Sequence, residues 1–153
     1  GFTTDWEPCT WDNAWLRMKA DCVVNDPENG VVIDFKTGKK FGNEIKHTEQ
    51  LQLYSLCKFL REPTLENITA EIWYLDKDDL LSIQVTRKLA MERYLKVYDH
   101  RLHRMTNATE FPAKPNVVSC KYCPYGDTGH CDKRVVDDKA TNNFYSRKFS
   151  KKG

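Results

Sequence analysis

A short strand-like segment carries the residues that could do chemistry. Three apolar β-forming residues lead into Asp34, Phe35 and Lys36, and a Thr-Gly turn follows. Because side chains alternate along a strand, Asp34 and Lys36 project from one face, roughly 6–7 Å apart, whereas Phe35 shares the opposite, predicted core face with Val31 and Ile33. A carboxylate and an ammonium at the end of a strand can bind a divalent metal ion and position a water. This arrangement is what metal-dependent phosphodiester cleavage requires.

A second carboxylate, Asp21, lies in a neighbouring segment with a strand-like pattern. From residue 14 to residue 24 the side chains alternate. One predicted face is apolar (Ala14, Leu16, Met18, Ala20, Cys22, Val24) and the other is polar (Arg17, Lys19, Asp21). Residues 25–30 are turn formers, which predicts an antiparallel hairpin that brings Asp21 close to Asp34. Two adjacent carboxylates favour a hard cation with oxygen ligands, Mg²⁺ or Mn²⁺.

A helix is predicted from about Glu44 to Arg61, with two stripes at helical spacing. The predicted core stripe is Leu53, Leu56, Cys57 and Leu60, and the polar stripe beside it is His47, Gln50, Tyr54, Lys58 and Arg61. Gln50 and Tyr54 are one turn apart and point the same way. A polar, basic stripe beside a metal site suits a nucleic-acid backbone, and Tyr54 could stack on a base. An ordinary solvated helix face is the alternative interpretation.

Three motifs of this sequence resemble the PD-(D/E)XK nuclease superfamily. They are Lys19-Ala20-Asp21, the segment 32–38 that contains Asp34 and Lys36, and the Gln50-x-x-x-Tyr54 pattern. Within the superfamily they are most similar to the RecB-like branch and to the related CRISPR-adaptation and phage exonucleases, which carry a Gln-x-x-x-Tyr motif after the catalytic strand. The resemblance runs from about Trp15 to Cys131.

The resemblance implies a role for each motif residue. Asp21 and Asp34 would be metal ligands, joined by the backbone carbonyl of Phe35. Lys36 would orient or activate the attacking water and stabilise the developing phosphate charge. Gln50 and Tyr54 would position the scissile strand and the lysine. Basic residues near these motifs are predicted to contact DNA: Arg17, Lys19, Lys58 and Arg61.

The amino-terminal region departs from the family pattern. Family members usually have a helix before the first strand, and that helix often carries a His or Glu that completes the metal site. Residues 3–10 are instead typical of a loop. Glu7 is a possible substitute for the missing ligand.

A cysteine cluster lies near the carboxyl end, in Cys120-x-x-Cys123 followed by His130 and Cys131. Two thiolates on one tight loop can share a soft metal ion. RecB-like relatives with such a triplet and one distant amino-terminal cysteine often bind an iron–sulfur cluster, which implies Cys9 as the fourth ligand. The long gap before the third cysteine keeps open a zinc site completed by His130 or Cys9. A disulfide is a third possibility, disfavoured because intracellular thiols stay reduced.

Length and composition fit one compact domain. The chain has 153 residues, enough for a sizeable core. A mean hydropathy of −0.68 and the lack of a long apolar run argue against a membrane span. Since 24 basic residues face 22 acidic ones, the net charge of +2 does not by itself indicate a nucleic-acid partner. No signal-peptide pattern is visible, so an intracellular location is expected, with a phage or viral origin as a further possibility.

The remaining elements complete the expected domain. Strands are predicted at 68–75 and 80–86, joined as a hairpin by Asp-Lys-Asp-Asp. A helix from Arg87 to about Met105 is predicted to bury one side of its surface (Met91, Tyr94, Leu95, Tyr98, Leu102, Met105). Cys22 and Cys57 fall on predicted apolar faces and are expected to be small core residues. Residues 1–135 would form a single nuclease domain with a knuckle at 120–131, followed by a polar, basic tail at 136–153.

The sequence therefore predicts an α/β, restriction-endonuclease-like core: a mixed, mostly antiparallel sheet flanked by helices, with a Cys-rich knuckle. The predicted function is Mg²⁺- or Mn²⁺-dependent hydrolysis of DNA, single- or double-stranded. Cleavage from an end is expected from the resemblance, within recombination, repair or phage DNA processing and with a protein partner possible. RNA as the substrate stays open. The alternative from another class is a non-catalytic metal-knuckle module that binds nucleic acid or protein.

Overall fold

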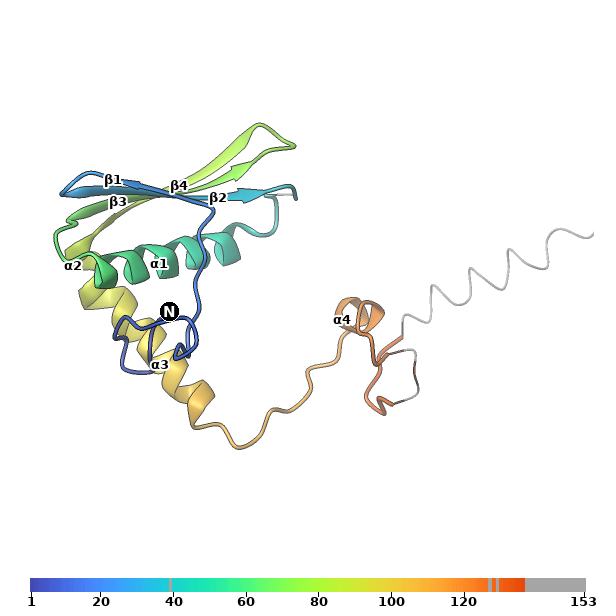
Figure 1. Ribbon diagram of the computed structural model, residues 1–153. Helices are drawn as coiled ribbons and strands as arrows, with labels where there is room; N and C mark the ends of the chain where they lie inside the picture. Colours follow the sequence, from blue (N-terminus) through green and yellow to red (C-terminus); the bar gives the residue numbers. More distant parts are fainter. Residues whose placement is uncertain (39, 127, 129, 137–153) are drawn as a thin grey trace, which may run out of the picture. The chain divides into compact units, whose positions relative to one another are not determined.

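The computed structural model describes residues 1–38, 40–126, 128 and 130–136. These residues form two compact units, Gly1–Asn107 and a second unit that begins at Ala108, and each is described by itself. The first unit contains a four-stranded sheet and the long helices (Figure 1). The predicted tail at 136–153 lies almost wholly outside the described residues, so the predicted boundary at residue 135 stays a prediction.

The sheet has the strand order β1-β2-β3-β4. Its members are β1 (Cys22–Asn25), β2 (Asn29–Lys36), β3 (Asn67–Tyr74) and β4 (Asp79–Thr86). The β1–β2 and β3–β4 pairs are antiparallel hairpins, whereas β2 and β3 are parallel and are connected through helix α1 (Glu44–Arg61). The predicted mixed, mostly antiparallel sheet flanked by helices is confirmed, as are both hairpins.

The first predicted strand is much shorter than expected, because β1 begins only at Cys22. The segment from residue 14 to 21 still alternates between half-buried and exposed side chains, as the pattern predicted. Its backbone leaves the sheet for a physical reason. The side chain of Asp21 accepts the Phe35 N–H at 2.8 Å, a donor that a continuing strand would have bonded with backbone carbonyls. Leu16 instead exchanges backbone hydrogen bonds with Phe2.

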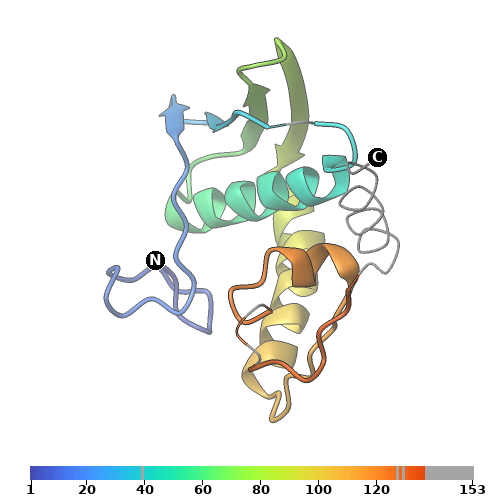
Figure 2. The same cartoon turned by 90° about the vertical axis from the view of Figure 1, so that its right-hand side faces the viewer.

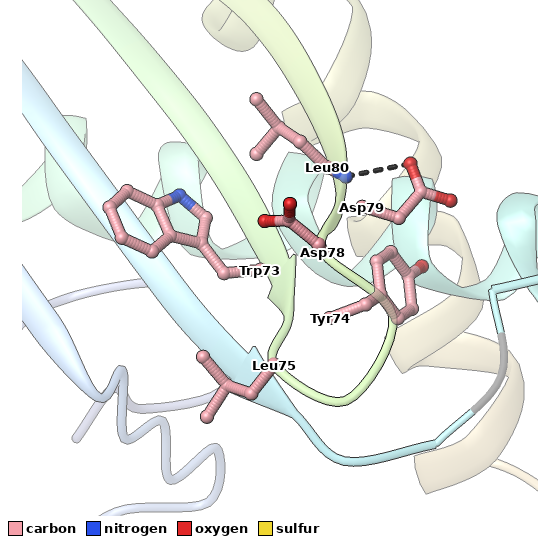
Figure 3. A pocket seen from close by; sticks show the side chains of 6 residues that line it. All are labelled: Trp73, Tyr74, Leu75, Asp78, Asp79 and Leu80. Atoms are coloured by element: carbon pink, nitrogen blue, oxygen red, sulfur yellow. Dashed lines mark hydrogen bonds between the residues drawn. The ribbon is translucent and has the colours of Figure 1, made fainter.

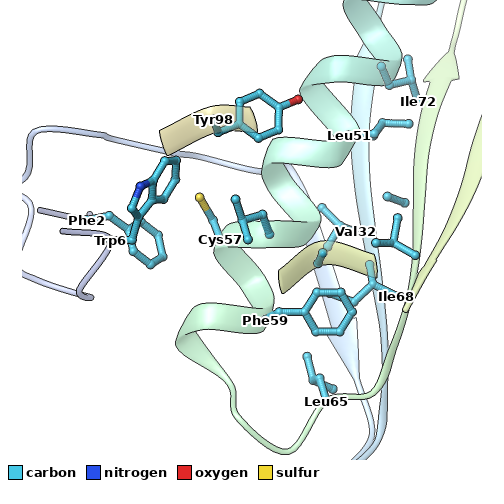
Figure 4. Packing of buried hydrophobic residues seen from close by; sticks show 14 of the residues in the cluster. Phe2, Trp6, Val32, Leu51, Cys57, Phe59, Leu65, Ile68, Ile72 and Tyr98 are labelled. Atoms are coloured by element: carbon cyan, nitrogen blue, oxygen red, sulfur yellow. The ribbon is translucent and has the colours of Figure 1, made fainter. Parts of the chain in front are cut away.

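The core lies between one face of the sheet and α1 (Figure 4). The sheet contributes Val32 from β2 and Ile68, Ala70 and Ile72 from β3, all buried. The prediction that Val31, Ile33 and Phe35 form the core face of β2 is wrong. They point to the opposite face, where Phe35 is 39% exposed. The reason is that the helices of this unit pack on the Val32 side only (Figure 1), so the described residues of the first unit leave the other face uncovered. Cys22, the register partner of Ile33, is also on this open face. The prediction that Cys22 is a core residue is therefore wrong.

Helix α1 has the predicted bounds but a wider buried surface than predicted. Leu56 and Cys57 are buried as expected. Leu53 and Leu60 are only partly buried, whereas three residues outside the predicted stripe are fully buried (Leu51, Ser55, Phe59). The reason is that α1 packs on two sides, against the sheet and against the helical segment after β4 (Figure 2). Burial raises the pKa of the Cys57 thiol to about 12, consistent with an unreactive core residue.

The residues after β4 form one helical run, as predicted. It consists of α2 (Arg87–Leu89), the π-helical segment η1 (Ala90–Tyr94) and α3 (Leu95–Thr106). Tyr98 and Leu102 are buried, but Met105 is 59% exposed, contrary to prediction, because the last turn extends past the packed surface. The amino-terminal loop packs here too: Phe2 and Trp6 are buried, and the Trp6 indole donates to Asp99 at 3.0 Å.

A single guanidinium ties the end of α1 to the start of this run. Arg87 donates to the carbonyl oxygens of Phe59 (3.2 Å), Glu62 (2.6 Å) and Leu65 (2.6 Å). The last carbonyls of a helix have no partner within the helix. Phe59 lies in the last turn of α1 and Glu62 is its C-cap residue, so two of these bonds complete the carboxyl end of α1, and the third holds the following loop at Leu65. The guanidinium also stacks over the Phe59 ring, 5.1 Å from its centroid.

The second unit contains the short helix α4 (Val117–Lys121). Its N-cap residue is Asn116, whose side-chain oxygen accepts the Ser119 N–H at 2.9 Å. The chain then turns through Cys123 to the buried Gly126, whose N–H bonds the Cys123 carbonyl. A Cβ at Gly126 would lie 2.9 Å from the Cys120 carbonyl oxygen, so this turn requires glycine.

Candidate active site

The polar residues predicted to do chemistry meet on the covered face of β2. Because side chains alternate along the strand, Asp34 and Lys36 project to the same side as the core residue Val32. Asp34 is only 4% exposed, although a buried carboxylate is costly unless it is paired. The Lys36 ammonium lies 2.7 Å from Asp34 Oδ2 and keeps about a third of its side chain exposed. The strand and the ion pair together fix the positions of the two groups, and the lysine stays accessible from solvent.

Helix α1 supplies the hydrogen bonds to the other oxygen of Asp34. The Gln50 amide donates to Asp34 Oδ1 at 3.1 Å and to the Tyr54 hydroxyl at 2.8 Å, which uses both of its N–H groups. These two residues are one helical turn apart, so a single helix face delivers both. Gln50 and Tyr54 therefore contact Asp34 directly and orient its carboxylate.

The Tyr54 hydroxyl lies between two acceptors, Asp34 Oδ1 at 3.3 Å and the Lys19 carbonyl at 3.1 Å. Burial raises the pKa of Tyr54, while the hydrogen bond from Gln50 acts in the opposite direction. The hydroxyl thus keeps its proton at neutral pH and remains a donor. It links β2 to the segment that carries Asp21.

Asp21 lies beside this site, as predicted. The β1–β2 pairing ends at Cys22 and Ile33, and Asp21, the residue before this pair, stays beside the Asp34 strand. The Asp21 carboxylate accepts the Phe35 N–H at 2.8 Å, which fixes its position relative to the Asp34 strand. Glu7, the possible substitute ligand, is exposed in the amino-terminal loop, and no contact among the described residues joins it to either aspartate.

The donor set suits a hard divalent cation. Asp34 Oδ2 is buried and is paired with the Lys36 ammonium at 2.7 Å, so a metal ion at this oxygen would lie directly beside the lysine. Asp21, Asp34 and the Phe35 carbonyl would be oxygen ligands of the type that Mg²⁺ and Mn²⁺ prefer. No group of three or more His, Cys, Asp or Glu side chains in the described part of the chain is arranged for a metal ion. A two-carboxylate site completed by a carbonyl is compatible with that finding.

The four residues predicted to bind DNA differ in their surroundings. Lys19 is exposed next to Asp21. Arg17 is exposed, donates to the Trp11 carbonyl and stacks over the Trp11 ring. Lys58 pairs with Glu62 and donates to the Asn25 side chain at 3.1 Å. Arg61 contacts the amino-terminal loop through the carbonyl oxygens of Gly1 and Cys9 and lies over the Phe2 ring.

A histidine–tyrosine pair that was not predicted lies close to Lys36. His47 Nδ1 lies 2.6 Å from the hydroxyl of Tyr74, which is the register partner of Lys36 on β3. Burial raises the pKa of Tyr74. The predicted polar stripe of α1 contained His47, but its partner on β3 could not be inferred from spacing within one helix.

The cysteines are distributed over both units, and all six are free thiols. In the second unit the half-buried Cys120, Cys123 and Cys131 accompany an exposed His130, and the Val135 N–H points at Cys120 Sγ, 3.5 Å away. Cys9 belongs to the first unit. The structure does not show the predicted metal knuckle, and both the iron–sulfur and the zinc alternatives stay predictions.

The chain was also compared with known proteins. A family model described as the PD-(D/E)XK nuclease superfamily matches residues 4–128. Neither a curated protein nor a solved structure matches the chain significantly. No helix in the described part of the chain is long and apolar enough to cross a membrane. The mixed sheet, the covering helix and this match agree on a restriction-endonuclease-like core, and membership of a nuclease superfamily implies hydrolysis of phosphodiester bonds in a nucleic acid. The chain belongs to the PD-(D/E)XK nuclease superfamily.

Proposed function

We propose that this protein is a deoxyribonuclease that requires Mg²⁺ or Mn²⁺. The observation that carries the proposal is the buried Asp34 carboxylate, with one oxygen held by Gln50 and Tyr54, the other paired with the Lys36 ammonium at 2.7 Å, and the Asp21 carboxylate beside the same strand. A buried carboxylate is costly unless it is paired, and Lys36 supplies one positive charge beside Asp34. A divalent cation would compensate the two carboxylates of Asp34 and Asp21 together.

Asp21, Asp34 and the Phe35 carbonyl would hold the ion. When bound, it would place positive charge at the scissile phosphate and lower the pKa of a bound water. Gln50 and Tyr54 fix the direction of the Asp34 carboxylate before substrate arrives, which is the preorganisation that electrostatic catalysis requires.

Lys36 acts on the phosphate and the attacking water. As an ammonium, it has hydrogens to donate and no lone pair to accept a proton. It therefore orients the water oxygen that forms the new P–O bond and stabilises the negative charge that grows on the phosphate while the leaving oxygen departs. Its partial exposure, together with its place at the end of β2, leaves it open to the substrate.

We further propose cleavage from DNA ends and a structural metal centre in the second unit. End-directed cleavage is supported by the likeness of the Gln50-x-x-x-Tyr54 pattern to exonuclease motifs. The metal centre is supported by the three half-buried cysteines within a dozen residues and by the backbone N–H directed at Cys120 Sγ, since thiolates that bind metals accept such bonds. An iron–sulfur cluster with Cys9 as fourth ligand is the preferred form, and zinc with His130 or Cys9 is the alternative.

The decisive experiment incubates the purified protein with end-labelled DNA, single- and double-stranded, linear and circular, with Mn²⁺, Mg²⁺ or EDTA. We expect metal-dependent release of short products from linear DNA and protection of circular DNA. Lys36→Ala should be inactive, whereas Lys46→Ala, which removes an exposed lysine of α1, should cleave like the wild type. Binding without cleavage under every metal condition would favour the non-catalytic module, and cleavage of RNA in place of DNA would correct the substrate.

The metal centre is tested separately by elemental analysis and visible absorption of protein purified without oxygen. Iron with broad visible absorption would support the cluster, and zinc in a colourless protein would support the alternative. Cys120→Ser should lower the melting temperature strongly because metal binding contributes to folding, whereas Cys57→Ser should cause a smaller loss of core packing. A stable protein that contains neither iron nor zinc would contradict the proposal.

A further inference from the structure

A pocket lies at the tip of the β3–β4 hairpin, next to the end of the Asp34 strand. It has a volume of about 230 Å³ and is lined by Trp73, Tyr74, Leu75, Asp78, Asp79 and Leu80. In Figure 3, Trp73, Leu75, Asp78 and Leu80 extend to one side of the hairpin, and Tyr74 and Asp79 extend to the other. The volume is below the roughly 300–1,000 Å³ of pockets that enclose drug-sized ligands, so it suits a single planar ring system.

One wall of the pocket is a tryptophan that is exposed yet held in a fixed orientation. Trp73 is 42% exposed. Its indole N–H donates to Glu71 Oε2 at 2.8 Å, and the Phe35 ring packs edge-on against it with centroids 5.9 Å apart. A rigid aromatic side chain loses little conformational freedom when a ligand stacks on it. The Trp73 ring is thus a preformed stacking surface.

The two acids of the pocket differ in availability. Asp79 accepts hydrogen bonds from Lys40 Nζ (2.8 Å) and from the Leu80 N–H (2.7 Å), and the bond from Lys40 is the main reason for its lowered pKa. Asp78, by contrast, has no hydrogen-bond or ion-pair partner among the described residues. Its carboxylate is an acceptor on the same side of the hairpin as the Trp73 indole. A ligand with an amino group at the edge of a flat ring would match both features.

The pocket is close to the catalytic strand. Lys36 is the register partner of Tyr74, and its carbonyl accepts the Leu75 N–H at 2.9 Å. Neighbouring strands are about 4.8 Å apart, so the residues that end β2 and β3 are adjacent. Lys36 is on the covered face and Trp73 is on the open face, so a nucleic-acid strand bound at Lys36 would reach the pocket by passing around this end of the sheet.

We propose that this pocket binds one nucleobase of the substrate, with the base stacked on Trp73 and its amino group bonded to Asp78. The inference rests on the proposed nuclease function and adds a base preference to it. Cytosine and adenine each present an exocyclic amino donor, whereas thymine presents carbonyl oxygens at those positions. A carboxylate acceptor therefore favours cytosine and adenine over thymine at the nucleotide next to the cleaved bond.

The test uses the Lys36→Ala protein in EDTA, so that no cleavage occurs, titrated with (dC)6, (dA)6 or (dT)6. Tryptophan fluorescence is compared with that of the same protein carrying Trp73→Phe, which isolates the Trp73 signal. We expect quenching of that signal and about three- to tenfold tighter binding of (dC)6 and (dA)6 than of (dT)6. Trp73→Ala should weaken binding about five- to a hundredfold. Trp15→Phe, which removes a tryptophan of similar exposure (43%), should leave affinity and preference unchanged.

Asp78→Asn tests the base preference most directly, because it replaces the carboxylate by an amide without disturbing the turn. Asp78 has a positive φ of 48°, a conformation that asparagine adopts at least as readily. The amide offers both a donor and an acceptor, so the preference for (dC)6 and (dA)6 should disappear while stacking on Trp73 remains. Circular dichroism verifies that each variant is folded.

The outcomes separate this inference from the nuclease proposal. If the wild type cleaves DNA but Trp73 is not quenched and Asp78→Asn changes no preference, the pocket proposal is overturned and the nuclease proposal stands. If the bases bind as expected but no metal supports cleavage, the nuclease proposal is overturned and the pocket proposal stands. Quenching of Trp73 by an arginine-rich peptide but not by the oligonucleotides would overturn the inference in favour of a basic protein segment.

Discussion

The two faces of strand β2 differ in a way that simple patterning does not anticipate. The covered face carries Val32 and then Asp34, whereas the open face carries Ile33 and then Phe35. A strand that only had to fold would place the phenylalanine inside and the aspartate outside. The reversal is the mark of a functional strand, since local rules are broken where the site demands it. The candidate site is thus on the packed face, and the open face carries the Phe35–Trp73 pair that is part of the proposed base pocket.

The largest expected effect separates two residues of β2 on opposite faces. Lys36→Ala should lower the cleavage rate by about 100- to 1,000-fold, because a positioned charge next to the phosphate is lost. Ile33→Val should change the rate of the same assay by less than about threefold, because this side chain is on the face opposite Asp34. Equal losses in the two variants would remove the distinction between the faces.

A stability measurement tests the same comparison without activity. Val32→Ala should lower the free energy of unfolding by about 2–3 kcal/mol, because removing part of this fully enclosed side chain leaves a cavity in the core. Phe35→Leu should cost less than about 1 kcal/mol, because part of the ring is already in water. Urea unfolding of both variants gives the values. A larger cost at Phe35 would show that something covers the open face.

The bonds from α1 to Asp34 are expected to have the next largest effect. Gln50→Ala removes the amide that bonds both Asp34 and Tyr54, so the rate should fall about 10- to 150-fold, the range for one hydrogen bond to a charged group. Gln52→Ala, on the opposite side of α1, is the control, and its rate should be near that of the wild type. Metal titration of Gln50→Ala should require more Mn²⁺ for half-maximal activity. An unchanged requirement would indicate that Gln50 acts on the substrate alone.

The smallest effect is expected for Tyr54→Phe, which keeps the ring and removes the hydroxyl. Asp34 Oδ1 retains the Gln50 bond, so we expect a loss of only about three- to tenfold in rate. The melting temperature should be almost unchanged, since the ring still packs at the edge of the core. A loss as large as that of Lys36→Ala would assign the hydroxyl a direct part in the reaction.

Much of this site could be predicted from the sequence because it depends on local spacing. Asp34 and Lys36 share a face through strand alternation, and Gln50 and Tyr54 share one through the helical repeat. The side of β2 that would be buried could not be predicted, since that depends on where α1 packs. Pairs that join distant elements, such as His47 with Tyr74, were inaccessible for the same reason.

The first strand illustrates the limit in another way. Alternation correctly gave the half-buried and exposed sides of residues 14–21, but Val24, predicted on the apolar face, is 60% exposed, and only Cys22–Asn25 belong to the sheet. Periodicity reports which side chains face the protein, but a strand also needs a partner for its backbone. Here Asp21 takes the amide of Phe35 and so ends the pairing with its side chain.

The Arg87 bonds to carbonyls at and just after the end of α1 also affect the opposite end of that helix. A helix held only by apolar contacts can slide along its axis, and a slip of one turn is about 5.4 Å. With three carbonyls bound to one guanidinium, such a slip would break all three bonds at once. Arg87 thus sets the axial position of α1 and, through this rigid rod, the height at which Gln50 meets Asp34. An arginine remote in sequence from every motif thus helps to position Gln50 relative to Asp34.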